Sequence, residues 1–161
     1  MNAAIPLAST APAQPRFVKI GEDGSRLAPD AAVWGAVLDT KTNLMWDAQT
    51  RHAENFQTAQ TVPLTLGVAG FTDWRMPTVQ ELFLLADHTR VCPAINTDFF
   101  PDTPNDWFWS SNAYAASPSA CAWGVNFALG YSGWGDRGNG GFVRAVRPGE
   151  CRPSLAKERA P

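Results

Sequence analysis

Charged residues are scarce in this chain, and it has no cluster of basic residues. Asp, Glu, Lys and Arg make up 17% of the 161 residues, below the rough quarter that is usual for soluble domains. The formal net charge is −2, and the basic residues are scattered along the chain. Because a protein that binds a phosphate backbone carries a basic patch or run, we expect no nucleic-acid partner.

The sequence pattern predicts neither a membrane-spanning segment nor an export signal. No apolar stretch approaches the roughly 18 to 20 residues that a membrane-spanning helix needs, so we expect no membrane span. Residues 1–15 have neither a basic stretch nor the continuous apolar stretch of a secretory signal. On the residues alone, the chain is therefore either cytoplasmic or has its export signal outside this sequence.

Soft metal ligands are few. The cysteines are Cys92, Cys121 and Cys151, and the histidines are His52 and His88. A structural zinc site needs four ligands, usually with close pairs, and these residues are widely spaced. We expect no metal and no cofactor. The odd number of cysteines leaves two alternatives open, which are three thiols or one disulfide with a spare thiol.

The chain length fits one domain with two short arms. Residues 1–15 are expected to form a disordered N-terminal arm, residues 16–150 the domain, and residues 151–161 a C-terminal tail. β-Branched and aromatic runs predict strands at Phe17–Ile20, Ala32–Leu38, Leu44–Trp46, Trp107–Ser111, Ala122–Ala128 and Phe142–Arg147. Turn residues at 39–43 join the second and third of these into a predicted hairpin.

Two short helices are expected between the early and the late strands. In Ala53–Thr61 the apolar positions are three apart. The second helix, Thr78–Asp87, starts with a capping box, because Thr78 is followed three residues later by Glu81. Residues Cys92–Pro104 are expected to form a long loop. Two early helices and a run of late antiparallel strands predict an α+β fold.

Seven short motifs follow one another in an order typical of one family. They are Asp39 with Leu44-Met-Trp46, Asp73-Trp-Arg-Met-Pro-Thr78 with Glu81-Leu82, Pro93-Ala-Ile-Asn96, Phe100-Pro101, Trp107-Phe-Trp-Ser-Ser111, Ala122-Trp-Gly-Val-Asn-Phe127 and Val143-Arg-Ala-Val-Arg147. From about Val33 to Arg147 the chain resembles the Lcl C-terminal domain family. The resemblance implies a C-type-lectin-like fold, in which two short helices flank a small antiparallel sheet and a long loop region carries the binding surface.

The same resemblance implies a role in adhesion. Family members resemble bacterial surface or secreted modules, and the best-known relative is a collagen-like adhesin that binds sulfated polysaccharide. An extracellular or cell-surface location is expected by resemblance, although this chain shows no signal peptide and lacks the collagen repeat. Because one fold serves many functions, the ligand has to be argued from particular residues.

A glycine-rich segment near the C-terminus is the strongest candidate for a binding surface. Residues 129–141 hold six glycines, and two aromatic side chains among them offer flat faces for stacking. Because ligand contacts concentrate on loops held by a rigid scaffold, we expect this segment to be a loop that binds a glycan or a protein. The predicted ligand-binding residues are Tyr131, Ser132, Trp134, Asp136, Arg137 and Asn139, helped by Asn105, Trp107, Asn112 and Tyr114.

The composition of this segment carries a further hypothesis. Gly, Tyr, Ser, Asp and Asn are reachable by changing adenines in an asparagine codon, and lectin-like folds resemble the variable proteins of diversity-generating retroelements. A diversified binding surface is therefore a hypothesis for residues 130–141. A template repeat and a reverse transcriptase in the flanking DNA would support it.

Two other functions stay open as alternatives. The fold class also resembles sulfatase-modifying enzymes of the formylglycine-generating type, but their paired cysteines have no counterpart here, because Cys121 and Cys151 are thirty residues apart. We therefore expect a protein that is not an enzyme and predict no catalytic residue. The third alternative is a structural oligomer with the glycine-rich segment buried between subunits. The sequence leaves the oligomeric state open.

Other large side chains are assigned to the framework. Arg144 and Arg147 are expected on opposite faces of one strand, and one of them is expected to pair with Asp73 or Asp39. A large aromatic in a strand-like segment most often fills core volume. The tryptophans expected in the core are Trp46, Trp74, Trp107, Trp109 and Trp123.

Overall fold

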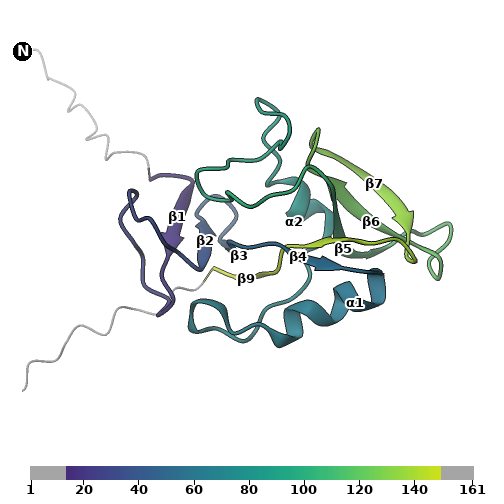
Figure 1. Cartoon of the computed structure of the whole chain (residues 1–161), viewed down its shortest axis with the longest axis horizontal. Helices are drawn as coiled ribbons and strands as arrows, with labels where there is room; N and C mark the ends of the chain where they lie inside the picture. Colours follow the sequence, from purple (N-terminus) through teal and green to yellow (C-terminus); the bar gives the residue numbers. More distant parts are fainter. Residues whose placement is uncertain (1–13, 150–161) are drawn as a thin grey trace, which may run out of the picture.

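Two small β-sheets with short helices beside them make up the fold (Figure 1). The structure is a computed structural model, and it describes residues 14–149. One sheet has four strands in the order β1-β2-β3-β9, and the other has five in the order β4-β8-β5-β6-β7. The predicted α+β class is confirmed. The predicted tail 151–161 and most of the predicted arm 1–15 lie outside the described residues.

The elements are short. The strands are β1 (Phe17–Ile20), β2 (Ala36–Asp39), β3 (Leu44–Asp47), β4 (Arg51–Ala53), β5 (Trp107–Ala113), β6 (Cys121–Asn126), β7 (Tyr131–Asp136), β8 (Gly141–Val143) and β9 (Val146–Pro148). The helices are α1 (Phe56–Thr61) and α2 (Val79–Phe83), with 3-10 helices η1 (Val62–Thr65) and η2 (Val68–Gly70). The paired strands run antiparallel, except that β5 and β8 pair in parallel.

The N-terminal strands follow the sequence pattern closely. β1 covers the predicted residues, and β2 with β3 forms the predicted hairpin, in which Leu38 lies opposite Met45. Asn43 closes the turn with a φ of 53°, in the left-handed region that Asn tolerates better than most residues. The one difference is the start of β2 at Ala36, since residues 32–35 are a connection.

Both expected helices are present, and each is shorter than predicted. α1 begins only after Asn55, whose side chain accepts a hydrogen bond from the Thr58 N–H at 2.9 Å. α2 has the predicted capping box, because Thr78 accepts from the Glu81 N–H and the Glu81 carboxylate accepts from the Thr78 N–H. After Phe83 the chain tightens into three-residue turns, which end the regular helix.

Two expectations about the C-terminal part are wrong. Residues 129–141 are not a loop, because Tyr131–Asp136 forms β7, the outer strand of the five-stranded sheet. Residues 142–147 are not one strand, because β8 ends at Val143 and β9 begins at Val146 in the other sheet. The sequence did not predict β7 because the segment is rich in glycine, which is depleted in strands. The change of sheet was not predicted, because the β-branched and aromatic residues of 142–147 have the pattern of a single strand.

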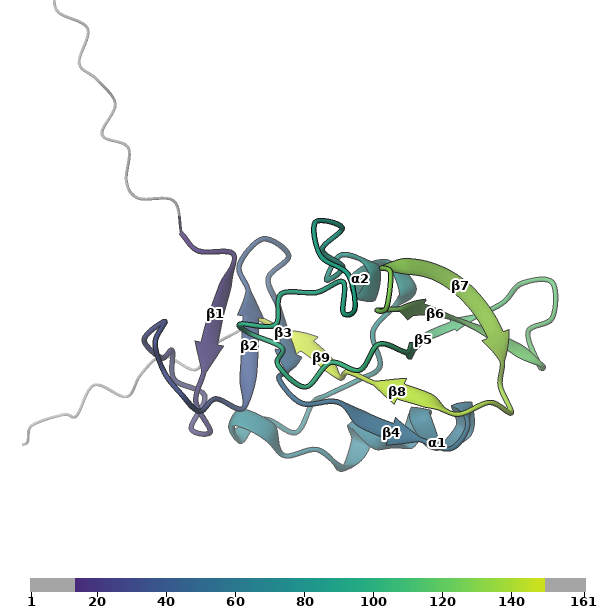
Figure 2. The same ribbon diagram turned by 45° about the horizontal axis from the view of Figure 1, so that its top comes forward.

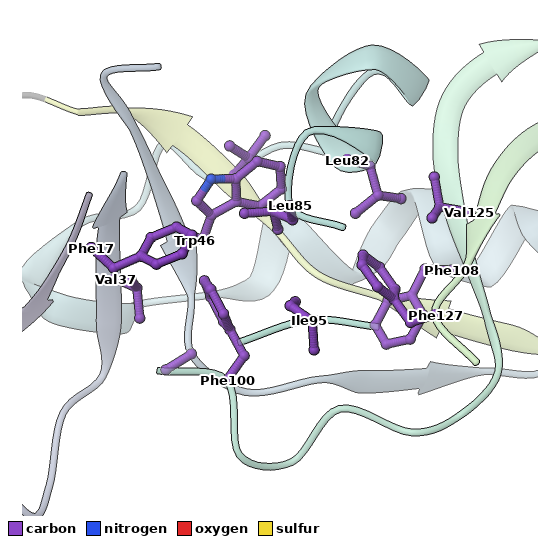
Figure 3. Packing of buried hydrophobic residues seen from close by; sticks show 12 residues of the cluster. Phe17, Val37, Trp46, Leu82, Leu85, Ile95, Phe100, Phe108, Val125 and Phe127 are labelled. Atoms are coloured by element: carbon purple, nitrogen blue, oxygen red, sulfur yellow. The ribbon is translucent and has the colours of Figure 1, made fainter. Parts of the chain in front are cut away.

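One hydrophobic core joins the two sheets (Figure 3). Its largest cluster takes Phe17, Val37 and Trp46 from the four-stranded sheet and Phe108 and Val125 from the five-stranded sheet. The segment that contains α2 closes this cluster, as Figure 3 shows. Because residues from both sheets pack into a single cluster, the candidate site described below is built on a rigid base.

The tryptophans divide between the core and the surface. Trp46, Trp74 and Trp109 are buried, as expected. Trp107 and Trp123 are only half-buried and lie on opposite faces of the five-stranded sheet. The expectation of five core tryptophans is therefore right for three, and the other two take part in the surface of this sheet.

Arg144 is fully buried where the chain passes from one sheet to the other. Its guanidinium donates to the carbonyl oxygens of Asp47 at 2.8 Å and Ala48 at 2.9 Å, and to the Thr103 hydroxyl at 2.8 Å. Burial lowers the pKa of Arg144 to about 10, so the side chain stays charged at neutral pH. Its three acceptors are two carbonyls and a hydroxyl, so Arg144 is not the arginine that pairs with Asp73 or Asp39.

Arg147, by contrast, has the expected carboxylate. Its Nε donates to Asp73 Oδ1 at 2.7 Å and its Nη2 to Asp73 Oδ2 at 3.1 Å. This hydrogen bonding holds the pKa of the Asp73 carboxyl below its ordinary value. Asp39 is instead paired with Arg16 at 2.9 Å.

Arg144→Lys is expected to destabilise the protein by about 2 to 4 kcal/mol. A lysine keeps the charge but lacks the planar guanidinium, so it cannot serve the buried carbonyl groups of Asp47 and Ala48 and the Thr103 hydroxyl together. Urea unfolding followed by tryptophan fluorescence measures the change. The matched control is Arg90→Lys on the exposed ion pair with Asp87, which should alter stability by less than about 1 kcal/mol. Equal effects of the two changes would contradict the role given to Arg144.

Candidate functional site

A groove lies between α2 and the outer strands of the five-stranded sheet. α2 packs on one face of this sheet, against β5 and β6 (Figure 2). The groove has a volume of about 390 Å³. Its lining comes from α2 and from three neighbouring strands and consists of Val79, Gln80, Phe83, Asn112, Ala113, Trp123 and Ser132.

Three aromatic side chains form a row beside this groove. Tyr114 stacks on Trp134 with the ring centroids 4.9 Å apart and the planes 12° from parallel. Tyr114 also meets Trp123 edge-on at 5.8 Å, and Trp123 lies opposite Trp134 across β6 and β7. Trp134 is 54% exposed. The row therefore presents the exposed Trp134 ring to solvent next to a concave surface, while Tyr114 and Trp123 are half-buried.

Hydrogen bonds fix the wall that α2 contributes. The Asn112 side-chain oxygen accepts from the Val79 N–H at 2.8 Å and so ties the first turn of α2 to β5. On the far side of the cap, Arg75 donates to both carboxylate oxygens of Glu81, at 2.8 and 2.7 Å. These contacts lower the pKa of Glu81, with the hydrogen bond from Arg75 as the largest cause. The wall is thus held in place before any ligand arrives.

The chemistry of the groove lining is polar but uncharged. Gln80 and Asn112 bring amide groups and Ser132 brings a hydroxyl, and the remaining lining residues are apolar or aromatic. Such groups exchange hydrogen bonds with hydroxyls and amides of a ligand. No ionisable side chain is among the lining residues, so the lining offers the Ser132 hydroxyl no general base.

Four glycines, of which three belong to residues 129–141, face Trp107 or Trp109 on the opposite face of the sheet. A Cβ at Gly124 would lie 2.7 Å from the Trp107 ring, and a Cβ at Gly141 would lie 2.8 Å from Trp109 Nε1. Gly133 and Gly135 of β7 also face the Trp107 ring, at 3.6 and 3.7 Å. The glycines therefore make room for two indoles packed against the sheet.

The predicted site residues do not form one surface. Four of them, Asn112, Tyr114, Ser132 and Trp134, lie at the groove. Tyr131 is 51% exposed, but it alternates with Ser132 along β7 and so points to the face that carries Trp107. The structure thus brings together four of the ten residues and places Tyr131 and Trp107 on the other side.

The other predicted residues lie at the ends of strands. Asp136 accepts from the Gly138 N–H at 2.7 Å, and the exposed Asn139 belongs to the same turn. Arg137 lies over the Phe56 ring at 4.4 Å and lines a separate hollow of about 550 Å³ beside α1. Asn105 is exposed in the connection that leads into β5. Although the hollow beside α1 is larger than the groove, it lacks the exposed aromatic row.

The sequence interpretation missed the contribution of α2. Val79, Gln80 and Phe83 line the groove, and Phe83 is 38% exposed. Trp123 was assigned to the core although it lines the groove as well. A usable signal was present, because the helix is too short to bury all of its apolar residues, and the excess has to face solvent.

Cysteine and metal chemistry are separate from the groove. Cys92 is exposed, Cys121 is buried, and the two are not bonded to each other. Cys151 lies outside the described residues, so the disulfide alternatives that involve it stay open. Within residues 14–149 no three Asp, Glu, His or Cys side chains gather as they would around a metal ion. Over the same residues, none of the helices has the length and apolar character of a membrane span.

The family is shown by a comparison with family models. The model of the Lcl C-terminal domain matches residues 35–147, which include both sheets apart from β1 and the end of β9, and all of the groove lining. The chain belongs to the Lcl C-terminal domain family. The resemblance inferred from the seven motifs is thereby confirmed over nearly the predicted range. A search of curated proteins finds no match.

Gly124→Ala is expected to destabilise this family member by about 2 to 3 kcal/mol. The added methyl group would collide with the Phe108 carbonyl oxygen and the Trp107 ring. The control is Gly67→Ala, where a Cβ meets nothing within 4 Å and stability should stay the same or rise by up to about 1 kcal/mol. Thermal unfolding of both variants measures the difference, and a tolerated Gly124→Ala would contradict the packing described.

The cap of α2 should make stability fall in acid. Because the folded protein lowers the pKa of Glu81, the stabilisation is present above the ordinary glutamate pKa and is lost as pH falls through the lower folded value. Glu81→Gln is therefore expected to be less stable than the parent at neutral pH, and to converge with it as pH falls. Urea titrations at several pH values measure this. A difference that is independent of pH would contradict it.

Proposed function

We propose that this domain is a non-catalytic ligand-binding module whose site is the groove beside α2, between the aromatic row and the helix. One observation carries the proposal, which is the exposed Trp134 stacked on the half-buried Tyr114 next to a concave, uncharged lining. Sites for small ligands are concave and largely apolar, with a few polar groups that fix orientation. The groove has this composition, and it is held by a pre-formed helix cap.

The ligand class that fits best is a neutral saccharide. The apolar face of a sugar ring stacks on an aromatic side chain, while its hydroxyls need donors and acceptors of the kind that Gln80, Asn112 and Ser132 supply. A sulfated polysaccharide, which the family resemblance implies, would need arginine or lysine in the lining. None of the lining residues is cationic, so we propose a neutral glycan.

A protein partner is the second candidate. Phe83 lines the groove and is 38% exposed, which leaves part of an aromatic side chain of α2 open to solvent. Exposed apolar patches of this kind mark interaction surfaces, and aromatic side chains are enriched at protein interfaces. The enzymatic alternative has weaker support, because the groove has no ionisable lining residue and Cys121 is buried on β6.

The finer fold that we propose is C-type-lectin-like. Three features support it: two short helices accompany antiparallel strands, a long irregular segment at 84–106 links α2 to β5, and the first and last strands lie in one sheet. A cell-surface role is a proposal by family membership alone. If residues 130–141 are diversified, the changes are expected at the side chains that face solvent, since Gly133, Gly135 and Gly141 make room for indoles.

Trp134→Ala is expected to weaken binding of the best neutral glycan at least tenfold, which is about 1.4 kcal/mol. A glycan array with neutral and sulfated oligosaccharides selects the ligand, and isothermal titration calorimetry measures the affinity. Gln80→Ala tests the opposite wall of the groove and should also weaken binding. Tyr131→Ala is the matched control, because an equally exposed aromatic on the other face should leave the affinity unchanged.

The outcomes separate the candidates. Binding only to sulfated glycans, or equal losses for the Trp134 and Tyr131 variants, would contradict the proposed site. If no oligosaccharide on the array binds, the glycan proposal fails and the protein partner becomes the first candidate.

A further inference from the structure

Four strands form the edges of the two sheets, and three of these edges are covered or very short. The outer edge of β1 is followed by residues 21–27, which fold back so that the Leu27 N–H donates to the Lys19 carbonyl at 2.9 Å. At β9, Val146 and Arg75 exchange two hydrogen bonds of 2.9 Å each. β4 has three residues and leads directly into the cap of α1. Among the strands of residues 14–149, only β7, with six residues, is a long edge.

The backbone of β7 presents free hydrogen-bonding groups on its outer side. The Arg137 N–H donates to the Ala120 carbonyl at 2.8 Å, and the register pairs Gly135 with Ala122 and Gly133 with Gly124. In an antiparallel pair, alternate residues bond to the neighbour and those between them point away. The backbone groups of residues 132, 134 and 136 therefore point outward, and of these the Asp136 carbonyl already accepts from the Asn139 N–H at 3.0 Å. Within residues 14–149, no hydrogen bond outside the strand pairing itself involves the backbone of Ser132 or Trp134.

The side chains of β7 do not protect this edge. Natural edge strands are guarded by lysine, proline, a bulge or a covering segment, because a bare edge pairs with other strands. β7 has the sequence Tyr131-Ser-Gly-Trp-Gly-Asp136, with one charged residue at its end, and its pairing with β6 is regular over all six residues. Figure 1 shows β7 on the outside of the five-stranded sheet, away from β1.

We propose that β7 pairs antiparallel with β7 of a second copy of this chain, so that two five-stranded sheets join into one. The outward groups fix the register, with Trp134 opposite Trp134 and Ser132 opposite Asp136 on both sides of the twofold axis. This pairing exchanges hydrogen bonds at Trp134 and gives the Asp136 N–H the Ser132 carbonyl as acceptor, while the Ser132 N–H donates a second bond to the Asp136 carbonyl, which has two lone pairs. It also keeps the two Asp136 carboxylates apart, since each faces a serine hydroxyl, and like charges directly opposite one another are unfavourable.

The register gives the dimer a functional geometry. A twofold axis perpendicular to the sheets keeps the same face of both copies on the same side. The groove beside α2 of one copy and that of the other would then share one continuous face, with the two Trp134 rings at its centre. A repeating glycan that reaches both grooves would bind more tightly than to one of them. The pairing itself does not rest on the proposed function, since it uses backbone groups.

The first test is the molar mass of the full chain. Multi-angle light scattering over a concentration series that reaches the millimolar range should show the mass rising to twice that of the monomer. Ser132→Pro removes an outward N–H and leaves the hydrogen bonds to β6 in place. It should therefore lower the association constant of the dimer at least tenfold. Circular dichroism and the melting temperature verify that the proline variant folds. A parent protein that stays monomeric throughout, or a folded proline variant that dimerises like the parent, overturns the proposal.

The second test fixes the register and does not depend on the proline variant. In a chain with Cys92→Ser, Cys121→Ala and Cys151→Ser, which also removes the thiol opposite residue 136 on β6, the double change Ser132→Cys with Asp136→Cys places thiols on residues about 5.5 Å apart between copies at Cα, within disulfide reach. Each single change is the matched control, because identical residues would then be roughly 14 Å apart across the axis. Mild oxidation should give a covalent dimer on a non-reducing gel for the double variant only. Equal cross-linking by a single variant, or none by the double variant, overturns the register.

Discussion

The packing of Trp107 against glycines is the contact on which the rest of the site depends. Gly124 on β6, Gly133 and Gly135 on β7, and Gly141 at the start of β8 all face Trp107 or Trp109. Without a Cβ at these positions, the large rings lie close against the strands. β7 thereby keeps its place beside β6, and its other face is free to carry the aromatic row at the groove.

Arg144 provides the second constraint, because the chain has to leave one sheet and enter the other within two residues. A change of sheet exposes backbone carbonyls that no neighbouring strand can satisfy, and a buried carbonyl without a donor is costly. The guanidinium supplies donors to two such carbonyls and to Thr103. Asp47 ends β3 and Ala48 begins the connection to β4, which also changes sheet, so Arg144 of the β8–β9 connection ties the two crossings together and holds the five-stranded sheet to the sheet behind it.

The local signals in the sequence predicted much of the fold. The capping box at Thr78 and the hairpin around Asn43 depend on residues within a few positions of one another, so each could be found from the sequence, and the structure confirms both. β7 could not, because a glycine-rich strand is stabilised by an indole that comes from another part of the chain. Propensity describes the residue alone and is overruled by such contacts.

The same distinction explains the partial success at the site. Tyr131 and Trp134 were predicted as a pair because both are aromatic and lie close together in the glycine-rich segment. In the structure both side chains are exposed. Taking the segment as a loop left their relative direction open, whereas a strand sends neighbours that are an odd number of residues apart to opposite faces. The period of the backbone therefore decides that Trp134 belongs to the groove and that Tyr131 does not. It also puts the outward N–H and carbonyl groups on alternate residues, so the aromatic row and the free edge of β7 follow from one geometric rule.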